Sequence, residues 1–369
     1  MRAVVLMEPN ATLQVMELRD PDPGQGEVRI DVAACGVCHT DLHVMKGEVK
    51  FPTPAVLGHE ISGVVSGVGQ GVAGIHVGDR VASSFIMPCG HCRHCVRGAD
   101  DLCETFFAYN RLSGTLYDGT SRLALPGGEP VAMYSMGGLA TQCVVPATDV
   151  FAVPDSLKLR DVATLGCSAL TAYGAIRNVA DVRPGDTVAV VGVGGVGSAL
   201  VQLAAVFGAA RIVAIDVADD KLAAAVRLGA TDVVNVRKED VAGAVASITG
   251  GRGVDAAFEA LGSSATFEAA TDIVGDGGAV VVIGIAAAGV KGSVDLSRLP
   301  RRKLRILGSY GARPRTDMPE LIGLVERKAF VPQAIVSRRF SLDDAAAAYG
   351  ALARGEITGR AVIDVGGQE

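Results

Sequence analysis

The sequence predicts an α/β fold with two domains, one rich in β-strands and one built on a doubly wound parallel sheet. The chain has 369 residues, which is long enough for two domains with cores of ordinary size. In the first 150 residues, short strand-forming runs are separated by turn residues, as in β-rich domains. From about Ser168 onward, apolar strand patterns alternate with helical patterns, which indicates a parallel sheet covered by helices.

The β-rich part is predicted from two runs near its start. Residues 28–32 alternate between apolar and polar side chains, which is typical of a strand with one buried face. Residues 61–68 are rich in Gly, Val and Ser, and we interpret them as a pair of short strands. Prolines in residues 21–24 and 52–54 interrupt the chain before and between these runs.

The parallel sheet is predicted to begin at residues 187–191, a continuous apolar run of the kind that forms a buried parallel strand. We then expect a helix at 196–207, a strand at 211–215, a helix at 221–228, and strands at 233–236, 256–259, 279–285 and 304–307. After Tyr310 we expect a helix at 318–327, a strand near 335–336, a helix at 342–353, and a last strand at 360–365 that returns to the first domain. The predicted β-rich domain therefore comprises residues 1–168 and 311–369, and the parallel-sheet domain comprises residues 169–310.

The composition excludes several classes of partner. The net charge is −6, whereas a protein that binds nucleic acid or an anionic membrane needs a basic surface. The N-terminus becomes polar at residues 8–10, too early for a signal peptide, and the most apolar stretch, residues 277–290, is too short to span a bilayer. We therefore expect a cytoplasmic protein whose closely spaced cysteines are reduced and available to metals.

A glycine-rich turn, Gly192-x-Gly194-x-x-Gly197, follows the first parallel strand and opens a helix. Taken alone this pattern is weak, because it also occurs in ordinary glycine-rich loops. In this context Gly192 permits a tight turn, Gly194 lets a pyrophosphate approach, and Gly197 allows the helix to pack closely on the strand. The free N–H groups of the helix then favour phosphate binding. Gly195 and Val196, within the same turn, belong to the predicted dinucleotide site.

Asp216 ends the next predicted strand, at about the spacing expected for an acid that binds a ribose. A carboxylate accepts hydrogen bonds from the 2′-hydroxyl of NAD and repels the 2′-phosphate of NADP. Val217 and Ala218 provide no arginine for that phosphate. The sequence therefore predicts NAD as the coenzyme; the alternative is that Asp216 only caps the end of the strand.

Four cysteines with short spacing form the strongest local motif of the sequence: Cys89, Cys92, Cys95 and Cys103. Four thiolates this close can enclose one zinc ion in a closed tetrahedral site, which would be structural because it leaves no open position. An iron–sulfur cluster is the competing interpretation. We refer to residues 89–103 as the four-cysteine lobe.

Over essentially its whole length the chain resembles the zinc-dependent medium-chain alcohol dehydrogenases of the long-loop type. The matching segments are CGVCHTDLH (35–43), GHE (58–60), the four-cysteine lobe, GCSALTAYGA (166–175), GVGGVG (192–197) and Gly359-Arg360. The resemblance implies a GroES-like catalytic domain with both zinc sites and a Rossmann NAD-binding domain. It also implies zinc-dependent interconversion of alcohols, primary aliphatic or aromatic ones above all, with aldehydes or ketones by hydride transfer to and from NAD.

The resemblance further implies that Cys38, His59 and Cys167 bind a catalytic zinc, so that each chain carries two zinc ions. Glu60 would approach this metal during ligand exchange, and Asp41 would orient the histidine ligand. Thr40 would take the alcohol proton and pass it, through the coenzyme ribose, to His43.

The remaining residues implied by the resemblance bind the coenzyme or the substrate. The further coenzyme-binding residues are His39 and Arg360 at the phosphates, Lys221 at the adenosine ribose, Thr171 and Val196 at the nicotinamide, and Ile285. The substrate pocket would be lined by Phe85, Val49, Ala108 and Met133, with Ile285 also a candidate.

Other functions and assemblies stay open at this point. Residues 106–108 lack the basic residue of glutathione-dependent formaldehyde dehydrogenases, yet another thiol adduct is still a possible substrate. A zinc-binding regulatory protein without catalysis, or a redox dithiol formed by Cys35 and Cys38, is also conceivable. The long segment 105–136 resembles the loop of the dimeric members of this family, so the resemblance implies a homodimer rather than a tetramer, with the predicted strand at 304–307 as a possible joining edge. We expect a small-molecule substrate and neither nucleic acid nor membrane as a partner.

Overall fold

The structure is a computed structural model that describes residues 1–366. The chain divides into two compact units. The first comprises residues 1–170, 313–328 and those described from 336 onward, and the second comprises residues 171–312 and 329–335. Residues 329–335 thus group with the second unit, whereas the boundaries expected from the sequence put them in the first. No helix among residues 1–366 is long and apolar enough to cross a membrane.

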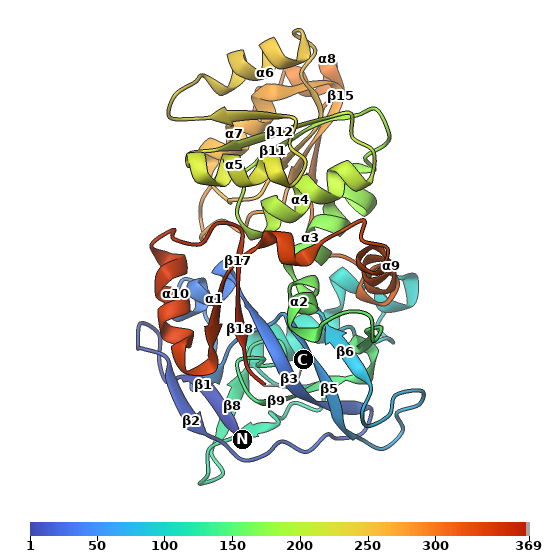
Figure 1. Cartoon of the computed structure of the whole chain (residues 1–369), viewed down its shortest axis with the longest axis vertical. Helices are drawn as coiled ribbons and strands as arrows, with labels where there is room; N and C mark the ends of the chain where they lie inside the picture. The colour runs from blue at the N-terminus through green and yellow to red at the C-terminus, as the bar shows by residue number, and fades with distance from the viewer. Residues whose placement is uncertain (367–369) are drawn as a thin grey trace. The chain divides into compact units, whose positions relative to one another are not determined.

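The strands described in the first unit form two sheets (Figure 1). One is five-stranded, with the order β2(Gln14–Glu17), β1(Arg2–Leu6), β4(Ala55–Val56), β8(Pro130–Met133) and β7(Leu123–Ala124). The other is seven-stranded: β10(Phe151–Ala152), β6(Arg80–Ser83), β5(Ile61–Val68), β3(Glu27–Val37), β18(Arg360–Asp364) and β17(Val336–Ser341), with β9(Gln142–Pro146) also on β3. Because β18 pairs with β3, the last strand does return to the first unit.

Residues 61–68 form one continuous strand, β5, so the expected pair of short strands is wrong. The glycine content reflects close packing against β3 and not a turn. A Cβ at Gly63 would lie 2.2 Å from the carbonyl oxygen of Asp31, so only glycine fits beside that strand.

The first unit also contains the α-helices α1(His39–Met45), α2(Leu159–Val162), α9(Pro314–Glu326) and α10(Ala345–Ala353). Its 3₁₀ segments are η1(Cys95–Arg97), η2(Asp100–Leu102), η4(Ala147–Asp149), η5(Ala163–Gly166) and η8(Leu342–Asp344). Residues Phe106–Arg111 form a π-helix, η3. Figure 1 shows α10 beside α1, and residues of the two helices are in contact. This pairing of distant segments becomes important for the metal site.

The sheet described in the second unit has six parallel strands in the order β13(Asp232–Asn235), β12(Arg211–Asp216), β11(Thr187–Val191), β14(Val254–Glu259), β15(Val274–Val282) and β16(Arg305–Gly308). Its helices are α3(Ser168–Gly174), which begins in the first unit, η6(Ala175–Ala180), α4(Gly195–Val206), α5(Asp219–Arg227), α6(Val241–Thr249), α7(Ser264–Ile273), α8(Arg298–Arg302) and η7(Pro332–Ile335). The strand order reverses between β11 and β14. Ligands of doubly wound sheets bind at such a point, beyond the carboxyl ends of the strands.

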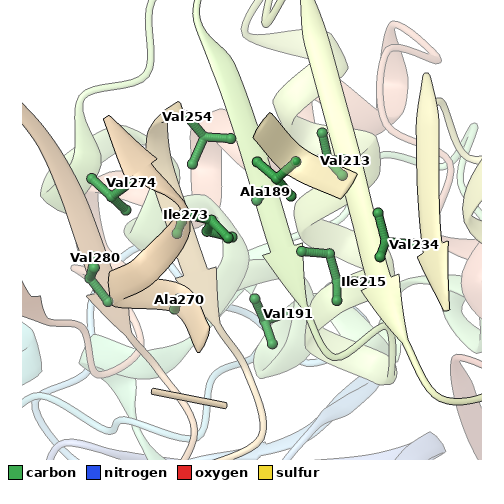
Figure 2. Packing of buried hydrophobic residues seen from close by; sticks show 12 residues of the cluster. Ala189, Val191, Val213, Ile215, Val234, Val254, Ala270, Ile273, Val274 and Val280 are labelled. Carbon is green, nitrogen blue, oxygen red and sulfur yellow. The ribbon is translucent and has the colours of Figure 1, made fainter. Parts of the chain in front are cut away.

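Valine, isoleucine and alanine side chains fill one face of this sheet. Figure 2 shows residues of β11, β12 and β13 side by side, with α7 contributing Ala270 and Ile273 to the same cluster. Helix α7 was not predicted, although Ser263 accepts a hydrogen bond from Thr266 N and caps its first turn. The carboxyl ends of β11 and β12, two strands of this face, carry the glycine turn and Asp216.

Candidate active site and metal centres

Four side chains of types that can hold a metal ion come together in the first unit. One ligand atom each of Cys38, His59, Glu60 and Cys167 lies within 4.8 Å of the others, and all four residues are buried. Cys38 lies between β3 and α1, and His59 and Glu60 directly precede β5. Since β3 and β5 pair antiparallel, the end of one lies beside the start of the other. Cys167 joins them from the junction of η5 and α3.

Two glycines let these loops approach each other. Gly58, directly before the histidine donor, has a φ of +89°, and a Cβ there would lie 2.7 Å from the backbone nitrogen of Leu139. At Gly166, directly before the last cysteine donor, a Cβ would lie 2.2 Å from the carbonyl oxygen of Ser83. A side chain at either position would therefore force the backbone next to one of these candidate ligands to shift.

The donor set suits zinc, which takes thiolate, imidazole and carboxylate ligands in catalytic sites. Burial raises the pKa of Glu60 to about 7, although Arg360 favours its ionised form. The hydrogen bond between Cys38 and Cys167 lowers the pKa of the Cys38 thiol well below its usual value, and the same bond and burial raise the pKa of Cys167. Because so many acidic groups share a buried site, a divalent cation would compensate their charge, and the residues fit a zinc ion.

The imidazole of His59 is held by Asp41. The distance from His59 Nδ1 to Asp41 Oδ1 is 3.0 Å, and the exposed fractions of the two side chains are 2% and 0%. Burial, the largest influence, lowers the pKa of His59, but Asp41 and Cys38 act the other way and raise it to about 10. An Nδ1–H bonded to a carboxylate leaves Nε2 as the ligand atom.

Arg360 lies beside the metal donors. It is 4% exposed, and its guanidinium is paired with both carboxylate oxygens of Glu60, through Nη2 to Oε1 and through Nε to Oε2 at 3.3 Å. The sequence analysis predicts that Arg360 binds a coenzyme phosphate, and it does not predict the ion pair with Glu60. Its physical cause is that a buried carboxylate needs an opposite charge nearby. The role of Arg360 toward phosphate stays a prediction.

The four-cysteine lobe brings its sulfur atoms together locally, within 4.8 Å of one another. The backbone N–H of Cys92 donates to Cys89 Sγ at 3.3 Å, and those of Cys89 and Phe106 donate to Cys103 Sγ at 3.3 and 3.4 Å. Such bonds stabilise thiolates. For Cys92, burial alone raises the pKa, but backbone N–H groups outweigh it and lower the pKa to about 6. The donors fit a closed structural zinc site.

A distant arginine ties the lobe to the rest of the first unit. Arg315, near the start of α9, bonds Oδ1 of Asp100 through Nε and Nη2 at 3.0 and 2.6 Å, and it donates to the carbonyl oxygen of Cys95 at 2.6 Å. The Asp100 side chain is 1% exposed and that of Arg315 is 34% exposed. This contact between residues 215 positions apart had no signal in the sequence.

Arg315→Ala should therefore loosen the lobe. The change leaves the Asp100 carboxylate buried without its ion-pair partner, at a cost of about 1–3 kcal/mol in the free energy of unfolding. We expect a lower urea midpoint and faster loss of zinc to a chelator. Arg93→Ala is the matched control, because Arg93 pairs with Glu104 at 2.6 Å on the exposed side of the lobe, with side chains 70% and 48% exposed. Equal effects of the two variants would contradict the assignment.

The glycine turn of the second unit joins β11 to α4. Gly192 has a φ of +92°. A Cβ at Gly197 would lie 1.9 Å from the carbonyl oxygen of Gly192, whereas a Cβ at Gly194 would have no neighbour within 4 Å. Gly195 and Val196 start α4 and are half-buried. The turn is therefore tight at its base and open at Gly194, as a pyrophosphate site requires.

Asp216 lies beside this turn and is 7% exposed. Its Oδ2 accepts from Val193 N at 2.8 Å, and its Oδ1 accepts from Val217 N and Ala218 N at 2.7 and 3.1 Å. The carboxylate thus fixes the backbone of the turn. A carboxylate offers about four acceptor positions, so one remains for a ligand hydroxyl.

The other expected coenzyme residues lie in both units. His39 is the exposed first residue of α1 in the first unit. In the second unit, Thr171 is buried on α3, Lys221 is half-buried on α5, and Ile285 follows β15 and is 45% exposed. Their roles toward NAD stay predictions.

The expected relay residues lie on α1. Thr40 Oγ1 is 3.5 Å from Cys38 Sγ, and His43 Nδ1 is hydrogen-bonded to Glu48. The helix therefore carries both residues from the metal donors toward the surface of the unit.

The expected pocket residues differ in their surroundings. Phe85 is 7% exposed, and its ring centre lies 6.1 Å from that of His59. Val49 is half-buried, and Ala108 is exposed on η3. Met133 is 0% exposed in β8, and its role toward a substrate stays a prediction. Tyr134, which was not predicted, stacks edge-on against His59 at 5.9 Å.

Two family models match the chain: "Alcohol dehydrogenase GroES-like domain" over residues 24–155 and "Zinc-binding dehydrogenase" over residues 195–327. A putative alcohol dehydrogenase D of Mycobacterium tuberculosis is 34% identical over 96% of this chain and 97% of its own. An S-(hydroxymethyl)glutathione dehydrogenase of Synechocystis is 36% identical over 88% of each chain. The crystal structure of benzyl alcohol dehydrogenase from Acinetobacter calcoaceticus has a TM-score of 0.93 and 30% identity, covering 99% of each chain. These matches confirm the predicted fold class, a GroES-like domain plus a Rossmann-type domain.

Proposed function

Since the chain belongs to the zinc-dependent medium-chain alcohol dehydrogenases, we propose that it interconverts primary aliphatic or aromatic alcohols and their aldehydes, with NAD as hydride carrier and two zinc ions per chain. The observation that carries the proposal is the buried cluster of Cys38, His59, Glu60 and Cys167. Three of these residues can hold a metal while one position stays open, which a catalytic zinc requires and a structural zinc does not.

Each residue of the cluster has a distinct task in this proposal. Zinc, when bound, polarises the alcohol oxygen and lowers the pKa of its hydroxyl. Cys38, Cys167 and Nε2 of His59 hold the metal, and Asp41 keeps the imidazole in the required tautomer. Glu60, neutralised by Arg360, remains close enough to exchange with a ligand.

The proton released from the alcohol leaves along α1. Thr40 Oγ1 takes it near the metal donors, and His43, three residues further on, delivers it to solvent. Residues three apart share one face of a helix. The imidazole of His43 is 34% exposed and bonded to Glu48, so it has access to water.

Asp216 supports NAD over NADP. Its carboxylate is fixed by three backbone N–H groups, so it cannot turn away from a 2′-phosphate, and the negative charges would repel each other.

The proposal is tested by measuring NADH formation from NAD⁺ with primary, benzylic, secondary and polyol alcohols, using zinc-loaded protein. We expect turnover of primary or benzylic alcohols, and kcat/KM at least about 100-fold lower with NADP⁺, which corresponds to about 2.7 kcal/mol of charge repulsion. A preference for NADP⁺ would refute the role of Asp216. Turnover restricted to polyols would refute the substrate class.

A thiol adduct is the second candidate substrate. It is favoured by the 36% identity to the S-(hydroxymethyl)glutathione dehydrogenase of Synechocystis. Adding formaldehyde with glutathione to the same assay distinguishes the two, since activity that depends on the thiol identifies an adduct.

We also infer a cytoplasmic homodimer. None of the eight cysteines is in a disulfide, which suits a reducing compartment. Strand β16 ends the described sheet of the second unit, and its Ile306 is 39% exposed, so the edge is available to a second copy. Light scattering that gave the mass of a monomer would contradict the dimer.

A further inference from the structure

The strongest unassigned contact near the metal donors involves Tyr349 on α10. This residue follows the alanine run 345–348 in the same helix. Tyr349 is 0% exposed, and its hydroxyl donates to Oδ2 of Asp41 at 2.8 Å, across 308 residues of sequence. A phenol tip buried on an otherwise small-residue helix indicates a specific polar role.

The two oxygens of Asp41 have different donors. Oδ1 faces Nδ1 of His59 at 3.0 Å and the backbone N–H of Gly58 at 3.3 Å, whereas Oδ2 takes the Tyr349 hydroxyl. The Asp41 side chain is 0% exposed, so water does not replace a lost donor. The tyrosine therefore fixes the rotation of the carboxylate, and the carboxylate in turn fixes the plane of the imidazole.

We propose that Tyr349 is a positioning residue for the metal ligand His59, acting through Asp41. The inference rests on the proposed function, because it assumes a zinc ion held by Cys38, His59 and Cys167. Tyr349 does not contact the metal or the substrate. It restricts Asp41, so that Nε2 of His59 points steadily toward the two thiolates.

The test is the rate at which zinc leaves the protein for a chelator, measured on holoenzyme carrying Tyr349→Phe. Replacing a residue that supports a metal ligand costs about 10–100-fold in affinity, and Tyr349 is one contact further away, so we expect zinc release from one of the two sites to be about 3–10-fold faster. The slower phase, assigned to the four-cysteine lobe, should not change. Phenylalanine keeps the ring and its packing, so the variant is expected to fold.

A double-mutant cycle separates positioning from packing. Asp41→Asn alone should speed zinc release more than Tyr349→Phe, and adding Tyr349→Phe to Asp41→Asn should change the rate less than twofold, because coupled residues are not additive. The same acceleration in both backgrounds would overturn the proposal. Tyr173→Phe, a buried tyrosine of the second unit, is the control for losing a tyrosine hydroxyl.

The visible spectrum of cobalt-substituted protein gives a second readout, since a change in the direction of the histidine ligand moves the ligand-field bands. We expect the bands to move in Tyr349→Phe and not in Tyr173→Phe. If Tyr349→Phe had the same spectrum and the same zinc release rate as the wild type, the inference about Tyr349 would be wrong, but the proposed function would stand. A wild-type protein that bound metal only in the four-cysteine lobe would overturn the proposed function together with the inference.

Discussion

Replacing Cys38 by serine should leave one zinc per chain and lower kcat/KM for alcohol oxidation by about 10³-fold or more. Cys38 is one of the buried donors that lie within 4.8 Å of one another. A metal acting as a Lewis acid contributes several kcal/mol to transition-state stabilisation, and each 1.36 kcal/mol is about a factor of ten in rate. Zinc per chain is measured by elemental analysis beside the kinetics.

Cys35→Ala is the matched control for this prediction. Cys35 belongs to the same CxxC motif and is fully buried, but it is not among the clustered donors. Burial raises the pKa of its thiol well above the usual value, which disfavours a metal-binding thiolate. Loss of zinc in Cys35→Ala, or two zinc ions retained in Cys38→Ser, would show that the ligand has been misassigned.

The coenzyme turn could be predicted because its parts are neighbours in sequence. The glycine pattern, the apolar strand before it and Asp216 at the end of the next strand all lie within residues 187–216. The spacing of these parts is typical of a dinucleotide-binding unit. The four-cysteine lobe is similarly local. In contrast, Cys38, His59 and Cys167 are far apart in sequence, so only the resemblance to a family grouped them, and the pairing of β3 with β5 explains why two of them meet.

The contacts that support the sites could not be predicted from the sequence. Tyr349–Asp41, Arg360–Glu60 and Arg315–Asp100 join residues 308, 300 and 215 positions apart. Each depends on how a helix or strand from the last part of the chain packs on the first part, and no periodicity or spacing encodes that. These contacts form only when the whole chain has folded, whereas each motif is contained in one short segment of the sequence.

Gly197→Ala should damage the second unit itself and, with it, coenzyme binding. The new Cβ would lie 1.9 Å from the carbonyl oxygen and 2.9 Å from the carbonyl carbon of Gly192, which are backbone atoms that cannot rotate away. Helix α4 must shift off β11, at a cost of about 1–3 kcal/mol or more, as for other overpacked sites. We expect a lower thermal midpoint. Because the phosphate site loses its shape, we also expect the NADH Kd, measured by NADH fluorescence, to rise at least about 100-fold.

Gly194→Ala separates binding from folding in the same turn. Its Cβ would have no neighbour within 4 Å, and the φ of Gly194 is −85°, outside the left-handed region that favours glycine. The thermal midpoint should therefore stay at the wild-type value. The methyl group would occupy the space through which a pyrophosphate approaches, so we expect an NADH Kd about tenfold higher, equivalent to 1.4 kcal/mol. If Gly194→Ala bound NADH as tightly as the wild type, no pyrophosphate would approach the backbone at Gly194, and the turn would not be the phosphate site.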